Sequence, residues 1–133
     1  MNKDVAEKWA EALRSGEYKQ GTSALLMDNK HCCLGVLCEV YKKETGDGQW
    51  SQAVGNSQAT HITAALMFTT INGSDTQLPP NAVCNWAGMN EMNAYPPGVR
   101  YEGLFTHFAE LNDKNRLSFD EIAELIEDQC ERI

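Results

Sequence analysis

The 133-residue sequence has no long hydrophobic run, since no apolar stretch approaches the roughly 20 residues of a membrane-spanning helix. Its first residues lead into a polar amphipathic segment, which is unlike a secretory signal. Basic residues are also scarce, because 11 Lys and Arg stand against 19 Asp and Glu, for a net charge of −8. Non-specific binding to duplex nucleic acid depends on basic side chains that neutralise phosphates. We therefore expect a cytoplasmic protein that engages neither a membrane nor duplex nucleic acid.

The common catalytic signatures are absent as well. The sequence contains no Walker loop and none of the patterns G-x-G-x-x-G, G-x-S-x-G and H-E-x-x-H. The run Asp113–Leu117 begins like a calcium loop, but Ser118 stands where an EF-hand requires glycine. The sequence thus predicts no cofactor, and it favours a binding protein over an enzyme.

The cysteine pattern suits neither a disulfide framework nor a zinc site. The number of cysteines is five, which is odd, and two of them are adjacent. They are Cys32, Cys33, Cys38, Cys84 and Cys130. Structural zinc takes four ligands, commonly in two closely spaced pairs, and no second pair follows Cys33 and Cys38. We predict reduced thiols that pack as small hydrophobic side chains, and no bound metal.

One alternative gives a cysteine a catalytic role. Cys33 is expected to open a buried helix, where the helix dipole stabilises a thiolate. The run Cys33–Leu37 resembles the start of the central helix of NlpC/P60-type cysteine peptidases, although the serine of that pattern is missing here. His61 or His107 would supply the general base. This resemblance implies a cysteine hydrolase.

Periodicity and turn signals predict an α+β fold in a single compact domain, residues 1–133. Helices are expected over residues 3–14, from Cys33 to a stop at Thr45-Gly46, and from Pro79-Pro80 to Gly88. Strands are expected at 22–27, 31–34 and 62–71, with a return through 76–78, while 45–60 and 89–98 are expected to be loops. The result is four to five helices with a small antiparallel sheet or hairpins.

The last third of the chain is expected to be helical. One stripe of apolar residues has helical spacing and consists of Leu104, Phe105, Phe108 and Leu111. After a break at 112–116, Ser118 begins the final helix, and Glu121 three residues on completes a capping box.

Aromatic side chains in polar loops predict a ligand pocket. Trp50, Trp86 and Tyr95 lie in or beside segments rich in Asn, Gln, Ser and Thr, which suits a planar base that stacks while amides bind its edge. Isolated basic residues would bind a phosphate, and the candidates are Arg14, Lys19 and Arg100. Trp86 has a second interpretation, as a side chain that fills the core at a helix end. The predicted ligand is a small nucleotide-type molecule.

The acidic charge is concentrated near the C-terminus. From Glu102 onward nine acidic residues stand against three basic ones, whereas residues 1–44 carry seven of each. This distribution supports an alternative function, inhibition of a partner protein through an acidic C-terminal helix that includes Glu124, Glu127 and Asp128.

Two stretches resemble small bacteriophage and prophage proteins. Trp9–Gly21 reads W-x3-LRSGxYxQG and Cys32–Cys38 reads CCLGVLC, and the blocks at 78–88 and 111–123 are similar to the rest of that group. The resemblance implies an accessory protein of an infected bacterial cell, and such proteins often act against host defences. We therefore expect a homo-oligomeric counter-defence protein that sequesters a nucleotide-type signalling molecule, with a host protein as the alternative partner.

Overall fold

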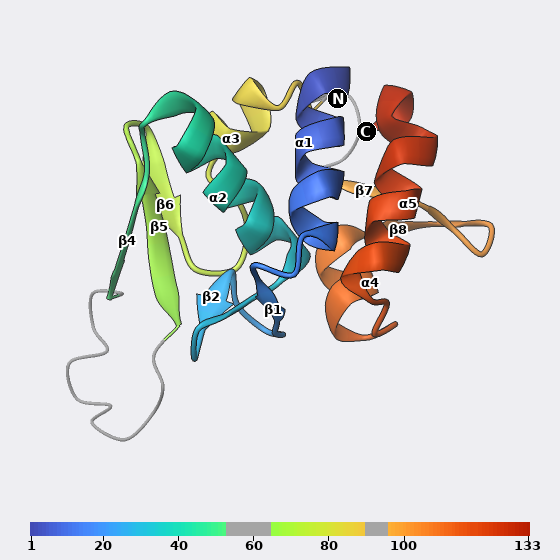
Figure 1. Cartoon of the computed structure of the whole chain (residues 1–133), viewed down its shortest axis with the longest axis horizontal. Helices are drawn as coiled ribbons and strands as arrows, with labels where there is room; N and C mark the ends of the chain where they lie inside the picture. Colours follow the sequence, from blue (N-terminus) through green and yellow to red (C-terminus); the bar gives the residue numbers. More distant parts are fainter. Residues whose placement is uncertain (53–64, 90–95) are drawn as a thin grey trace.

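Helices and short strands form the α+β arrangement that the sequence predicts. The computed structural model describes residues 1–52, 65–89 and 96–133. The α-helices in this part are α1 (Lys3–Arg14), α2 (Cys33–Thr45), α3 (Asn81–Trp86), α4 (Phe108–Asp113) and α5 (Phe119–Gln129), followed by a 3-10 turn, Cys130–Arg132. Helix α1 lies between α2 and α5, and the two termini are close together (Figure 1). No helix in the described ranges is long and apolar enough to cross a membrane.

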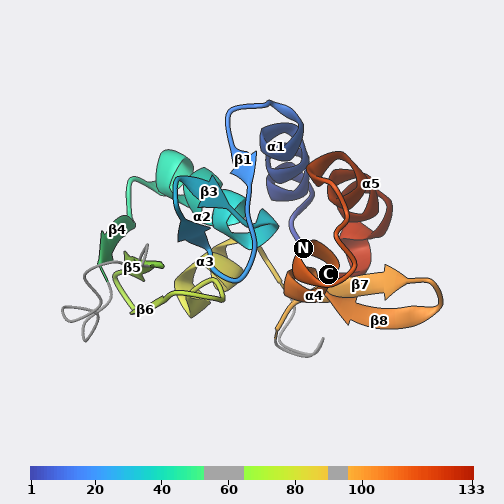
Figure 2. The same cartoon turned by 90° about the horizontal axis from the view of Figure 1, so that it is seen from below.

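The main sheet lies against α2 and has the strand order β1-β3-β2-β5-β4. Its strands are β1 (Lys19–Gln20), β2 (Leu26–Met27), β3 (Lys30–His31), β4 (Gln49–Gln52), β5 (Leu66–Thr70) and β6 (Gly73–Asp75). Strand β6 also pairs with β5, along Phe68–Thr70. The pair β1-β3 is parallel and the other pairs are antiparallel. A separate hairpin of β7 (Gly98–Tyr101) and β8 (Leu104–His107) lies at the opposite end of the molecule from β4 (Figure 2).

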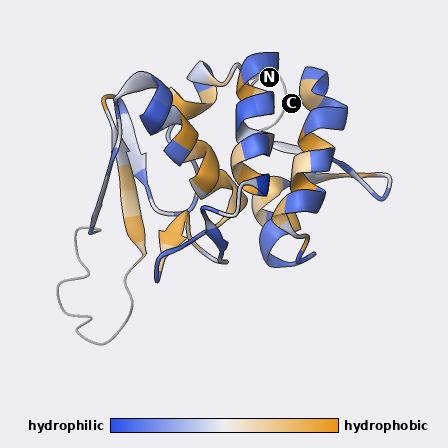
Figure 3. Cartoon of the chain, viewed as in Figure 1, coloured by the Kyte–Doolittle hydropathy of each residue, from blue (hydrophilic) through white to orange (hydrophobic). Residues whose placement is uncertain are grey.

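Many of the largest buried side chains come from the helices that face one another. Trp9 on α1, Leu37 on α2 and Ile122 on α5 are completely buried, as is Phe108 at the start of α4. The indole Nε1 of Trp9 donates to the carbonyl oxygen of Cys33 at 2.9 Å, and its ring meets Phe108 edge-on at 5.0 Å. In Figure 3 both α2 and β5 contain hydrophobic stretches, while much of α5 is hydrophilic. Burial of apolar surface therefore joins the helices and the sheet around α2.

Helix ends follow the local signals in the sequence. Gly46 ends α2 in the left-handed conformation, with φ 76°, and its N–H donates to the carbonyl of Lys42 at 2.9 Å. Ser118 caps α5 by accepting from the N–H of Glu121, while the Glu121 carboxylate accepts from the N–H of Ser118. The predicted glycine stop and capping box are confirmed.

The expected helix at Leu104 and Phe105 is wrong, because both residues belong to β8. Leu104 is 71% exposed and Phe105 is 44% exposed. Glu102 and Gly103 turn the chain with φ of 50° and 83°, as a two-residue hairpin turn of the I′ type requires. The spacing of the apolar residues fits a helix by coincidence, and the Glu-Gly turn is a weaker signal than Asn-Gly.

Several strand boundaries also differ from the prediction. Residues 49–52, expected within a loop, form β4, in which Trp50 pairs with Phe68 of β5. The predicted strand at 22–27 is reduced to β2, β3 ends before α2 begins at Cys33, and the return strand after β5 is β6 instead of 76–78. A polar strand such as β4 obtains its hydrogen bonds from a distant partner, so its own composition does not reveal it. Part of the expected loop 45–60 and of the strand 62–71 lies outside the described residues.

Candidate functional site

Many residues of the two sequence motifs hold the fold together. The buried side chain of Asn112 accepts from the Gln20 amide at 2.9 Å and from the Cys33 backbone N–H at 3.2 Å. Its own amide donates to the Gly21 carbonyl at 2.8 Å, and the Gln20 amide also donates to the Leu117 carbonyl. Asn112 therefore ties α4 to the ends of both motifs, and these motif residues have a structural role.

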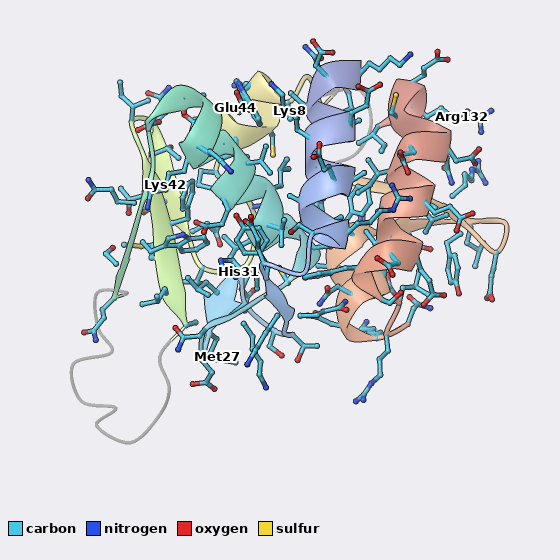
Figure 4. The ribbon with its side chains drawn as sticks, in the orientation of Figure 1. Lys8, Met27, His31, Lys42, Glu44 and Arg132 are labelled. Atoms are coloured by element: carbon cyan, nitrogen blue, oxygen red, sulfur yellow. The ribbon has the colours of Figure 1, made fainter. Side chains whose placement is uncertain are left out.

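Tyr18 of the first motif and Glu39, which directly follows the second, converge with His31 and Trp50. The Trp50 indole Nε1 donates to Glu39 Oε1 at 2.5 Å, and Glu39 Oε2 lies 3.7 Å from His31 Nε2. The His31 ring is edge-on to Tyr18 at 5.0 Å and to Trp50 at 5.8 Å. Figure 4 shows His31 at the end of α2 where the short strands meet. Tyr18, His31, Glu39 and Trp50 are the aromatic–carboxylate cluster.

The imidazole of His31 is the unusual member of this cluster. The residue is 8% exposed, and neither ring nitrogen has a hydrogen-bond partner among the described residues. Burial lowers the pKa of His31, and the nearby Glu39 carboxylate acts in the opposite direction. The ring is therefore neutral near pH 7 and holds polar groups whose desolvation is uncompensated.

Lowering the pH should destabilise the protein through His31. In the unfolded state the His31 imidazole takes up a proton at about pH 6.5, whereas in the folded state it does so only at lower pH. The free energy of unfolding therefore falls as the pH drops below about 6.5. His31→Phe retains a ring between Tyr18 and Trp50 and should show a smaller loss. Urea unfolding between about pH 7.5 and about pH 5 measures this difference. An equal loss in both proteins would contradict the neutral, buried imidazole.

A groove between α1 and α2 adjoins the cluster and shares Tyr18 with it. Its volume is about 290 Å³. The groove is lined by Lys8, Glu11, Ala12, Ser15, Glu17, Tyr18, Val40, Lys43 and Glu44. Lys8 and Glu44 form an ion pair at 3.1 Å where the two helices face each other (Figure 4). Burial raises the pKa of the Tyr18 phenol, and the carboxylates of Glu39 and Glu17 raise it further, so the phenol stays protonated as a hydrogen-bond donor.

The predicted aromatic ligand residues Trp50 and Trp86 are linked through the core. Trp50 packs on Phe68 at 4.7 Å, Phe68 meets Tyr41 at 6.3 Å, and Tyr41 meets Trp86 at 5.4 Å. The contact with Tyr41 favours the interpretation of Trp86 as a core-filling side chain. Tyr95 lies outside the described residues.

The predicted phosphate-binding residues lie on separate elements. Arg14 at the end of α1 pairs with Glu127 of α5, and Lys19 is exposed on β1. The guanidinium of Arg100, on the β7–β8 hairpin, donates to the Gly103 carbonyl at 3.2 Å. The structure thus does not bring these three residues together with Trp50. The basic residues beside the groove are Lys8 and Lys43, which no motif distinguishes from other surface lysines.

The environment of Cys33 does not suit a nucleophile. The residue is fully buried, and its thiol donates to the Phe108 carbonyl at 3.5 Å. Burial raises the pKa of Cys33 well above its ordinary value, and it raises that of Cys32 to about 11. A catalytic thiol requires the opposite shift.

Of the two histidines proposed to assist Cys33, the structure describes His107. His107 Nδ1 is 2.9 Å from the Pro96 carbonyl, and His61 lies outside the described residues. In the ranges that the structure describes, no three His, Cys, Asp or Glu side chains gather as metal ligands would.

Comparison with known proteins gives one family match. A family model described as a domain of unknown function (DUF8296) matches residues 1–130. No curated protein and no solved structure matches the chain.

Proposed function

The chain belongs to the DUF8296 family of domains of unknown function, and for this member we propose the binding of a small nucleotide-type ligand in the groove between α1 and α2. The observation that carries the proposal is the position of Tyr18, which lines this groove and packs against the buried His31. The ring nitrogens of His31 have no hydrogen-bond partner in the part of the chain that the structure describes. A volume of about 290 Å³ is just below the usual range for small-molecule sites, which begins at about 300 Å³. The groove therefore has room for a compact ligand, and an aromatic ring is among its lining side chains.

The groove offers a separate group for each part of such a ligand. The Tyr18 ring gives a surface on which a planar base stacks, and carboxylates such as Glu17 accept hydrogen bonds from the N–H groups of its edge. Lys43 supplies a positive charge for a phosphate, and Lys8 supplies a second one beside Glu44. These groups bind a ligand without breaking any of its bonds, so the proposal is sequestration and not catalysis.

The cluster behind Tyr18 fixes the position of its ring. His31 contacts Tyr18 on one side and Trp50 on the other, and Trp50 is held by its hydrogen bond to Glu39. A ring that is already ordered loses little conformational entropy when a ligand stacks on it. Trp50 thus supports the proposed site from behind, which differs from the direct ligand contact expected from the sequence.

The cellular role follows from the resemblance of the sequence blocks to phage proteins. We propose that the chain acts in the cytoplasm of an infected bacterium and sequesters a signalling nucleotide of a host defence system. Reduced host immunity upon expression of the protein, with recovery when the groove is altered, would support this role. Native mass spectrometry of the purified protein gives the number of subunits and tests the expected homo-oligomer.

Changes in the groove should weaken nucleotide binding. Tyr18→Ala removes the stacking surface, which is worth about 1–3 kcal/mol, and should weaken binding about 5- to 150-fold. Lys43→Glu replaces the attraction for a phosphate by repulsion and should weaken binding by at least about tenfold. Calorimetric titration with a panel of linear and cyclic mono- and dinucleotides measures both effects.

Lys42→Glu is the matched control, because Lys42 is the exposed neighbour of Lys43 and does not line the groove (Figure 4). Its affinity should equal that of the unchanged protein. Binding of no nucleotide in the panel, or equal affinity in the Lys43→Glu and Lys42→Glu proteins, would refute the proposed function.

A further inference from the structure

The β7–β8 hairpin and α5 form an apolar surface away from the nucleotide groove. Tyr101 and Leu104 are opposite each other in the hairpin register, so their side chains lie on the same face. Tyr101 also lines a hollow of about 170 Å³ with Leu117 and Leu125. Leu104 is 71% exposed. The hollow with its apolar extension at Leu104 is the hairpin–α5 surface, and it presents more apolar area than a single exposed residue would.

Gln129 fixes the hairpin to α5. Its side-chain oxygen accepts from the Arg100 N–H at 2.8 Å, and its side-chain nitrogen donates to the Arg100 carbonyl at 2.7 Å. The amide thus pairs with the β7 backbone as a neighbouring strand would. Because both ends of the contact are within ordered elements, the surface is formed before any partner arrives.

Acidic side chains border the apolar residues. Glu121 and Glu124 line the hollow itself. Asp120 and Asp128 are also exposed on α5, whereas Glu127 pairs with Arg14 of α1. Much of α5 is accordingly hydrophilic in Figure 3. The surface therefore combines an apolar centre with a negatively charged border.

We propose that the hairpin–α5 surface binds a basic amphipathic segment of another protein. An apolar side chain of the segment enters the hollow beside Tyr101 and Leu125, and its Lys or Arg residues pair with Glu121 and Glu124. Charge disfavours a second copy of this chain, because the net charge is −8 and the same acidic helix would face itself. This partner site goes beyond the nucleotide site, with which it shares none of its lining residues.

Selection from a displayed library of random peptides tests this proposal. The selected peptides should carry Lys or Arg beside Leu, Met or aromatic residues, and their binding should weaken as salt is added. Leu104→Asp and Glu124→Lys should each weaken binding by at least about tenfold. Both residues are exposed, so the fold should persist.

Ile71→Asp is the control, because Ile71 is 81% exposed and follows β5 in the other sheet. It should leave peptide binding unchanged. The proposal is overturned by a library that yields no binder, by binders without basic residues, or by binding that Leu104→Asp and Glu124→Lys leave intact. A dimer in sedimentation analysis that Leu104→Asp dissociates would also overturn it, since the occupant would then be a second copy.

Discussion

Replacing Gly35 by alanine is expected to prevent stable folding of the chain. A Cβ atom at this position would lie 1.9 Å from the carbonyl oxygen of Leu25 and 2.8 Å from its carbonyl carbon. Leu25 is fully buried, its N–H donates to Thr76, and its carbonyl accepts from Cys32, so the backbone there has no room to move. The cost should exceed about 4 kcal/mol, which is a large part of the stability of a small domain. Circular dichroism with urea unfolding measures it.

Gly46→Ala is the control, because it replaces a glycine at a position where the new Cβ meets no steric clash. Gly46 has φ 76°, and nothing lies within 4 Å of the position of a Cβ. Alanine should therefore cost only about 1–2 kcal/mol, the price of the left-handed conformation. If Gly35→Ala were no more destabilising than Gly46→Ala, the close approach of α2 to Leu25 would be incorrect.

Asn112→Leu is expected to destabilise the protein by about 3–5 kcal/mol. The side chain has 1% exposure and serves as both acceptor and donor in the network of motif residues. Leucine has a similar size but leaves the Cys33 N–H and the Gly21 carbonyl without that partner. Urea unfolding with an unchanged m-value would show this loss as a lower midpoint.

Asn115→Leu is the matched substitution at an exposed position just after α4. It should change the free energy of unfolding by no more than about 0.5 kcal/mol. Similar losses for Asn112→Leu and Asn115→Leu would show that the hydrogen bonds of Asn112 contribute little to folding.

Features specified by neighbouring residues could be predicted from the sequence. The glycine after α2 and the Ser118–Glu121 pair before α5 both act within a few residues, and both ends were identified correctly. The α+β class also follows from local patterns. The β7–β8 hairpin was missed because Leu104 and Phe108 have helical spacing, and because only pairing with β7 shows Leu104 to be part of a strand.

The candidate site depends on contacts that no local pattern specifies. Tyr18 occurs in one sequence motif and Glu39 directly follows the other, but their approach to His31 and Trp50 requires α1, β3, α2 and β4 to be placed. Trp50 could be singled out because an aromatic residue in a polar segment is unusual. Lysines such as Lys43 could not be distinguished, because only the packing of α1 beside α2 places this lysine at the groove.

The most direct test of the nucleotide groove is an NMR titration of isotope-labelled protein with the same nucleotide panel. We predict that a binding nucleotide shifts the backbone amide signals of Tyr18, Val40 and Lys43, which lie around the groove, and leaves those of the β7–β8 hairpin unchanged. Shifts confined to the hairpin and α5, or no shift with any nucleotide of the panel, would contradict the proposed site.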